Sequence, residues 1–135
     1  TVGYADPQQV REVFKAVMTE VGSIPVAAHF HDTRGTGLAN VAAALDCGVR
    51  IFDASLAGLG GCPFAPGASG NIVMEDLCFM LDSMGLITGV DLEKLLLVRE
   101  IAAQNLASNL MTGALARAGL PKHYKTAQER STVSA

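Results

Sequence analysis

Residues 24–54 read IPVAAHFHDTRGTGLANVAAALDCGVRIFDA, two short apolar runs on either side of a helical pattern. The first run, residues 24–31, has the length of a buried strand and leads into a polar, glycine-bearing loop at 32–37. Residues 38–47 carry their apolar side chains on one helical face, and residues 49–54 resume a strand. The order strand, helix, strand predicts two parallel strands joined by a crossover helix.

Helices are predicted on both sides of this stretch. Asp6-Pro7 with Gln9 forms a capping box at the start of a helix over residues 6–21, which has one apolar face and ends at Gly22. Further helices are expected at about residues 75–84, 92–106 and 111–118, with Asp91 as the N-cap of the second. The polar residues from Lys122 onward are expected to fray.

The composition favours an α/β fold. Half of the 135 residues are hydrophobic, there is no Trp, and aromatic residues make up only 5%. This mixture is typical of helices packed closely on buried strands. Two strands, with a short third around Ile72 as the only further candidate, do not cover their own edges and faces, so we expect part of a larger sheet or barrel.

Charge and motifs narrow the class of protein. A net charge of -3 with scattered basic residues argues against nucleic acid as a partner. We expect no membrane association, because no 18-residue apolar run or signal peptide is visible, and the ending STVSA carries no readable address. Three cysteines without a paired framework predict reduced thiols in a cytosol-like compartment.

His29 and His31 are the first candidate site residues. Two positions apart on a strand, they leave the same face, while Ala28 and Phe30 point the other way. At the carboxyl end of a strand, where a barrel places its active site, such a pair can chelate a metal. Two histidines that are merely hydrogen-bonded at a strand end are the alternative.

Residues 58–71, GLGGCPFAPGASGN, hold five Gly and two Pro and predict a long shaped loop. The loop presents Cys62, although a packed cysteine is the ordinary alternative. Asn71, at its end, is either a neutral metal ligand or a helix cap, and from spacing alone the cap is favoured. Asp32 either orients an imidazole or pairs with an arginine, and Asp53 on the second strand needs a partner that the sequence does not reveal.

Two imidazoles with oxygen ligands, and no cysteines at zinc-site spacing, favour Mg, Mn or another catalytic divalent ion over structural zinc.

The segments HFHDTRGTGLAN at residues 29–40 and GLGGCPFAPGASGN at 58–71 resemble motifs of the 3-hydroxy-3-methylglutaryl-CoA lyases. That family belongs to a superfamily of TIM-barrel metal-dependent lyases and Claisen-type synthases, in which the Gly-Gly-Cys-Pro loop separates lyases from synthases. The resemblance covers roughly residues 1–120. It implies the C-terminal portion of a (β/α)8 TIM barrel, with parallel strands and crossover helices, followed by C-terminal helices.

Residue by residue, the resemblance implies metal binding by His29, His31 and Asn71 and catalysis by Cys62. The implied reaction cleaves 3-hydroxy-3-methylglutaryl-CoA to acetyl-CoA and acetoacetate, with Mg or Mn as a Lewis acid on the tertiary hydroxyl. Loss of the hydroxyl proton drives carbon-carbon cleavage, and the acetyl-CoA enolate is then protonated. Cys62 is the implied acid/base in that second half, with His29 sharing proton transfer.

The family's N-terminal part, with its ligand aspartate, catalytic arginine and much of its CoA surface, has no counterpart here. Because a barrel needs about 250 residues, we expect 1–120 to be a partial TIM-barrel domain and 121–135 a polar tail. Alone, these residues are expected to be inactive, and to be completed by another chain segment or by homo-oligomerisation. The resemblance implies the bacterial cytoplasm or the mitochondrial matrix as location.

Two other functions remain open. One is a Claisen-condensing acyltransferase of the same superfamily, which would share His29 and His31 but would not need Cys62. The other is a truncated chain that self-associates and has no catalytic activity.

Overall fold

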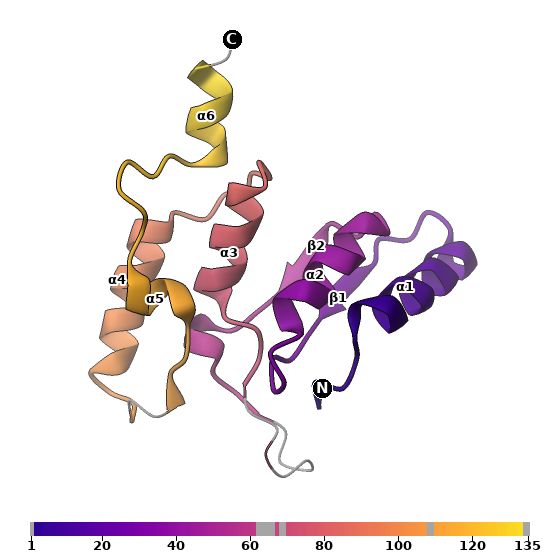
Figure 1. The fold of residues 1–135 in the computed structure, drawn as a ribbon, viewed down its shortest axis with the longest axis horizontal. Coiled ribbons are helices and arrows are strands. Elements are labelled where there is room, and N and C mark those ends of the chain that lie inside the picture. The colour runs from indigo at the N-terminus through magenta and orange to yellow at the C-terminus, as the bar shows by residue number, and fades with distance from the viewer. Residues whose placement is uncertain (1, 62–66, 68–69, 108–109, 134–135) are drawn as a thin grey trace. The chain divides into compact units, whose positions relative to one another are not determined.

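The computed structural model describes residues 2–61, 67, 70–107 and 110–133, which divide into two units. One unit holds the described residues of 1–55 and 60–72, and the other holds residues 56–59 and those from Val73 on. The first contains α1 (Pro7–Val21), β1 (Ala27–His29), α2 (Gly37–Asp46) and β2 (Ile51–Asp53). The second contains η1 (Leu56–Gly58), α3 (Met74–Ser83), α4 (Leu92–Ala103), α5 (Ala114–Ala118) and α6 (Ala127–Val133) (Figure 1).

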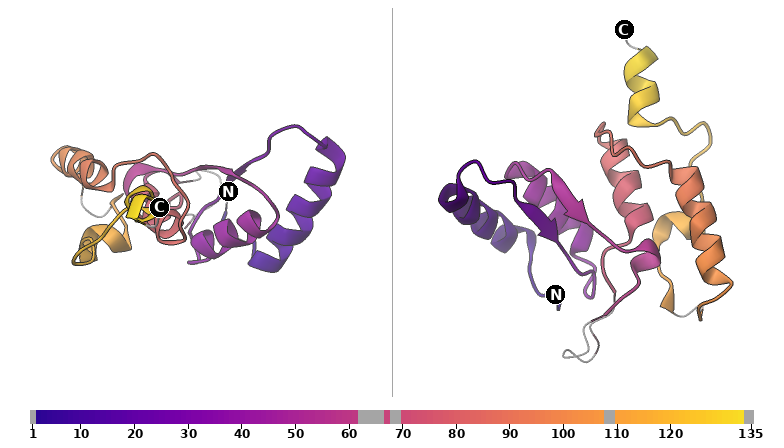
Figure 2. Two further views of the ribbon diagram at one scale, coloured as in Figure 1. Left: turned by 90° about the horizontal axis from the view of Figure 1, so that it is seen from above. Right: turned by 180° about the vertical axis from the view of Figure 1, so that it is seen from behind.

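The predicted strand, helix, strand arrangement is confirmed in the first unit. β1 and β2 pair in parallel, with Ala27 opposite Ile51 and His29 opposite Asp53. Helices α1 and α2 both lie on one face of the strand pair (Figures 1 and 2). Ala28 faces these helices and is buried, whereas the alternate residues on the other face are exposed. The strands are shorter than predicted, because only three residues of each find a partner in the other.

Helix α1 begins with the predicted capping box. The Asp6 carboxylate accepts hydrogen bonds from the backbone N–H groups of Gln8 and Gln9, and Gly22 ends the helix. The apolar face is only partly buried, since Val10 is 4% exposed but Val13 is 58% exposed. The predicted stripe is therefore wider than the surface that α2 and the strands cover.

The start of α2 is set by Gly37 and Asp32. A Cβ on Gly37 would lie 2.4 Å from Cγ2 of Ile72, so only glycine lets the helix approach this closely. The Asp32 carboxylate accepts from the Gly37 N–H at 2.7 Å. Asp32 is therefore used at the helix start, and neither role considered from the sequence, orienting an imidazole or pairing with Arg34, is the one observed.

No third strand forms around Ile72 among the described residues. The Ile72 N–H donates to the Phe30 carbonyl, and the Ser55 N–H donates to the Ile72 carbonyl. An isolated antiparallel bridge joins His31 to Asn71. The segment that leads out of the glycine-rich loop thus runs beside the carboxyl end of β1 without extending the sheet.

The second unit is helical and is centred on α3. Cys78 of α3, Leu92 of α4 and Leu115 of α5 form its buried cluster. Asp91 is the N-cap of α4, as predicted, and accepts from the Lys94 N–H at 3.1 Å. The helices end or begin a few residues away from the predicted positions, most clearly α4 at Ala103 and α5 at Ala114. None of the helices in the described part of the chain is long and apolar enough to cross a membrane.

A buried Glu75 organises the turn η1. Both of its carboxylate oxygens accept from the Ala57 N–H, and Arg99 donates to it at 2.7 Å. Ala57 has φ +57°, a left-handed conformation that costs a non-glycine residue of order 1 kcal/mol or more. Thr112 donates to the Ala57 carbonyl from both its N–H and its hydroxyl. Hydrogen bonds to both the N–H and the carbonyl of Ala57 therefore stabilise the strained turn.

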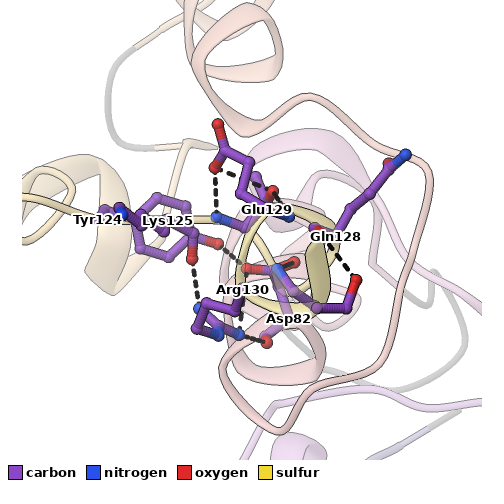
Figure 3. A network of polar contacts seen from close by, with 9 residues as sticks. Asp82, Tyr124, Lys125, Gln128, Glu129 and Arg130 are labelled. Carbon is purple, nitrogen blue, oxygen red and sulfur yellow. Dashed lines mark hydrogen bonds and ion pairs between the residues drawn. The ribbon is translucent and has the colours of Figure 1, made fainter. Parts of the chain in front are cut away.

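The C-terminal segment up to Val133 forms a helix and is hydrogen-bonded to α3, although fraying was expected. Asp82 accepts from the hydroxyl of Tyr124 (Figure 3). It also accepts from the Ala127 N–H at the start of α6. Arg130 donates to the Asp82 carbonyl, and Ala127 is buried. The expectation failed because the segment is anchored by a carboxylate more than forty residues earlier, which its own polar composition does not reveal. The predicted domain limits of 1–120 and 121–135 stay a prediction.

Candidate active site

A cavity of about 520 Å³ lies at the carboxyl end of β1 in the first unit. Most of its lining comes from the N-terminal segment and α1, and His29, Phe30, His31 and Asn40 complete it. The N-terminal segment is held here because Asn40 and Thr36 both donate to the Ala5 carbonyl. Arg34 adds a hydrogen bond to the Val2 carbonyl and lies over the Tyr4 ring at 4.3 Å.

His29 and His31 lie together, as the strand period predicts. Their ring centroids are 5.2 Å apart, with an angle of 65° between the ring planes. On the opposite side, Phe30 packs edge-on against Phe14 of α1. The packing of the intervening residue against α1 thus directs both imidazoles to the other side of β1.

His31 is buried and incompletely satisfied. It is only 6% exposed, and its Nδ1 has no hydrogen-bond partner among the described residues. Burial lowers the pKa of its imidazole, and the nearby His29 lowers this pKa further. A neutral imidazole with an unpaired nitrogen is the form that binds a metal ion. The alternative considered from the sequence, in which the histidines only form hydrogen bonds, does not account for the unpaired Nδ1 of His31.

Asn71 lies beside His31 through the antiparallel bridge between them. A Cβ on Gly60 would lie 2.9 Å from Asn71 Nδ2, so the φ of +94° and the missing side chain at Gly60 both make room for the amide. Asn71 is not the N-cap of α3, although spacing favoured that role, since Val73 holds the N-cap position. The three predicted ligand residues are therefore neighbours, and their role as ligands stays a prediction.

Asp53 is the residue that sequence reasoning could not place. It lies opposite His29 in the parallel register, and its Oδ1 contacts His29 Nδ1. The signal was present in principle, because two residues at the carboxyl ends of adjacent parallel strands become neighbours. It could not be used without the register.

Cys62, the predicted catalytic residue, lies outside the described residues. Among the cysteines that are described, Cys47 is half-buried and Cys78 is buried. Burial raises the pKa of the Cys78 thiol to about 11, and the charge of Glu75 contributes to the shift. Cys78 is therefore an unreactive thiol of the core.

The donor set fits a divalent ion in part. No group of three or more His, Cys, Asp or Glu side chains within the described part of the chain could hold a metal ion. The two imidazoles do lie side by side, Asn71 is bridged to His31, and Nδ1 of buried His31 has no hydrogen-bond partner among the described residues. Imidazole nitrogens suit transition-metal ions and the neutral amide oxygen suits Mn and Mg, with the remaining positions left for other ligands.

The chain is similar in sequence to proteins of a known family. A family described as HMGL-like matches residues 1–102. A hydroxymethylglutaryl-CoA lyase of Bacillus subtilis is 52% identical over 96 residues, which are 71% of this chain and 32% of that protein. The enzyme of Pseudomonas mevalonii is 43% identical over 129 residues, 96% of this chain and 42% of its own length.

A solved structure gives the same result. The HMG-CoA lyase of Acinetobacter baumannii, in complex with coenzyme A and 3-methylmalate, has a TM-score of 0.81 and 42% identity. The match covers 93% of this chain and 41% of that one. This chain therefore spans between 32% and 42% of the length of these relatives. The predicted fold class, α/β with parallel strands from a TIM-barrel family, is confirmed.

Proposed function

Because the chain belongs to the HMGL-like family, we propose that the complete protein is a divalent-metal-dependent lyase that cleaves 3-hydroxy-3-methylglutaryl-CoA. The products are acetyl-CoA and acetoacetate. The names of the similar proteins support this reaction, and the coenzyme A in the Acinetobacter structure supports an acyl-CoA substrate. The activity is assigned to the complete protein because the chain spans only part of each relative.

The observation that carries the proposal is the convergence of His29, His31 and Asn71 at the carboxyl end of β1. Residues in this position of a parallel α/β unit carry the chemistry in barrel enzymes. The unpaired nitrogen of the buried, neutral His31 lowers the stability of the fold, since an unsatisfied buried polar atom costs about 1–3 kcal/mol. A ligand at that nitrogen removes the cost.

In the proposed site His29, His31 and Asn71 hold the metal, Mn or Mg. When bound, the ion supplies Lewis-acid polarisation of the substrate's oxygen atoms. Cys62 acts as the acid/base that protonates the departing acetyl-CoA carbon.

The test is the release of acetoacetate from 3-hydroxy-3-methylglutaryl-CoA by the complete protein with Mn or Mg. We expect release in the wild type and its near-complete loss in His31→Ala. Cys47→Ser serves as the control, because this half-buried thiol lies outside the site and should leave the rate unchanged.

Stoichiometric metal binding without acetoacetate release would refute the lyase. Acetyl-CoA-dependent condensation that persists in Cys62→Ala would instead identify the acyltransferase alternative.

A further inference from the structure

We propose that Asp53 is a positioning residue for His29, which fixes the imidazole so that Nε2 is the nitrogen available to the metal. The proposal rests on the metal-dependent function proposed for His29 and adds a residue to that site. It starts from one contact, between Asp53 Oδ1 and His29 Nδ1, which joins the carboxyl ends of β1 and β2.

The contact has a chemical consequence for the ring. An ionised carboxylate only accepts hydrogen bonds, so His29 Nδ1 must carry the hydrogen that it donates to Asp53. When the ring is neutral, its lone pair is then on Nε2. Carboxylates commonly hold metal-binding histidines in this way, fixing both tautomer and orientation.

The strand register determines the contact between His29 and Asp53. His29 and Asp53 are directly paired positions of the two parallel strands, and both side chains leave the face that α1 and α2 do not cover. The distance between the two backbones is thus set by the sheet. Neither side chain needs a flexible loop to reach the other.

Stability alone does not explain the pair. The side chain of Asp53 is 66% exposed and that of His29 is 47% exposed. Ion pairs with such exposure contribute about 0–1 kcal/mol to folding. A carboxylate that adds little to stability, yet contacts a candidate metal ligand, is better explained by its effect on that ligand.

The other nearby carboxylate is already engaged. Asp32 follows the two histidines directly in the sequence, but its Oδ1 accepts from the Gly37 N–H at the start of α2. Among the described residues, the carboxylate that contacts His29 is that of Asp53.

The chain offers a closely matched control in Asp46. It is an exposed aspartate of the same unit, with a side chain 65% exposed, paired with Arg11 at 3.0 Å. It differs from Asp53 in its partner, which is an arginine in place of a candidate ligand. Asp53→Ala and Asp46→Ala therefore remove the same group from similar environments.

The experiment uses the complete protein and two measurements. Titration with Mn²⁺ should show about 10- to 100-fold weaker binding in Asp53→Ala and unchanged binding in Asp46→Ala. In the metal-free protein, ¹⁵N spectra of the imidazoles should show His29 protonated at Nδ1, with a shift to the Nε2-protonated form in Asp53→Ala. His29→Gln identifies the signal.

Equal Mn²⁺ affinity in Asp53→Ala and the wild type, with an unchanged His29 tautomer, would overturn the proposal. If His29→Gln weakens Mn²⁺ binding at the same time, the proposed metal site itself stands. Should the wild type bind no Mn²⁺, the proposed function fails, and the ¹⁵N spectra still decide whether Asp53 sets the tautomer.

Discussion

Among the described residues, the buried carboxylates of the helical second unit are paired, whereas buried polar side chains around β1 are incompletely paired. Glu75 and Asp82 use both of their carboxylate oxygens, on Ala57 and Arg99 in one case and on Tyr124 and Ala127 in the other. His31 and Asn40 line the cavity of the first unit, and each has a buried atom without a hydrogen-bond partner among the described residues.

The difference separates scaffold from site. Saturated networks rigidify a fold, whereas an unsatisfied buried polar atom costs stability and persists where a ligand uses it. Substitutions in the two regions should therefore have opposite consequences. Substitutions around the β1 site should abolish activity and leave the stability of the fold unchanged. Substitutions in the second unit should lower stability and leave the chemistry of the site unchanged.

The largest expected effect is that of Cys62→Ala on turnover. Loss of a general acid/base lowers kcat by about 10²- to 10⁴-fold. Mn²⁺ affinity and the free energy of unfolding should stay at wild-type values, because the cysteine is proposed neither as a ligand nor as part of the core. Acetoacetate release under saturating substrate measures the change. A variant that keeps wild-type kcat would remove Cys62 from the mechanism.

Glu75→Ala should have the largest effect on stability. It leaves Arg99 without its carboxylate and the strained Ala57 turn without its acceptor, which should cost about 3–5 kcal/mol. Chemical denaturation measures this cost, and Glu100→Ala on the exposed side of α4 is the control, with a change within about 0.5 kcal/mol. Equal stability of the two variants would contradict the scaffold role of Glu75.

A smaller effect is expected from alkaline pH. Burial raises the pKa of the Cys78 thiol from 9.0 to about 11, so the folded chain keeps a proton that the unfolded chain releases. The resulting stabilisation is complete below pH 9 and is lost as the pH rises toward 11. It amounts to about 3 kcal/mol.

Denaturation at a series of pH values measures this loss, and Cys78→Ala should reduce the slope. Burial and the hydrogen bond to Asp82 also raise the pKa of Tyr124, so Tyr124→Phe accounts for a second part of the alkaline slope. A slope in Cys78→Ala equal to that of the wild type would show that the thiol is not protected by burial.

Local signals predicted much of the fold and of the site. The capping box at Asp6, the helix end at Gly22 and the N-cap at Asp91 are each specified within a few residues, and each is observed. The alternation of side chains along a strand likewise placed His29 and His31 together. Such features depend on backbone geometry alone, which short stretches of sequence determine.

Contacts between distant residues could not be predicted in this way. Asp53 is 24 residues from His29, Arg99 is 24 residues from Glu75, and Tyr124 is 42 residues from Asp82. Each pair depends on the register of two strands or on the packing of separate helices, and no spacing rule encodes these. For the same reason, the polar C-terminal segment was expected to fray, although a distant carboxylate anchors it.

The most direct test of the site is to count the imidazoles bound to Mn²⁺ in the complete protein. Electron spin-echo modulation spectroscopy detects ligand nitrogens on a bound Mn²⁺ ion. We expect two coordinated imidazole nitrogens in the wild type and one in His31→Ala, with the Cys62→Ala spectrum like that of the wild type. A tightly bound Mn²⁺ ion with no imidazole nitrogen would contradict the assignment of His29 and His31 as ligands.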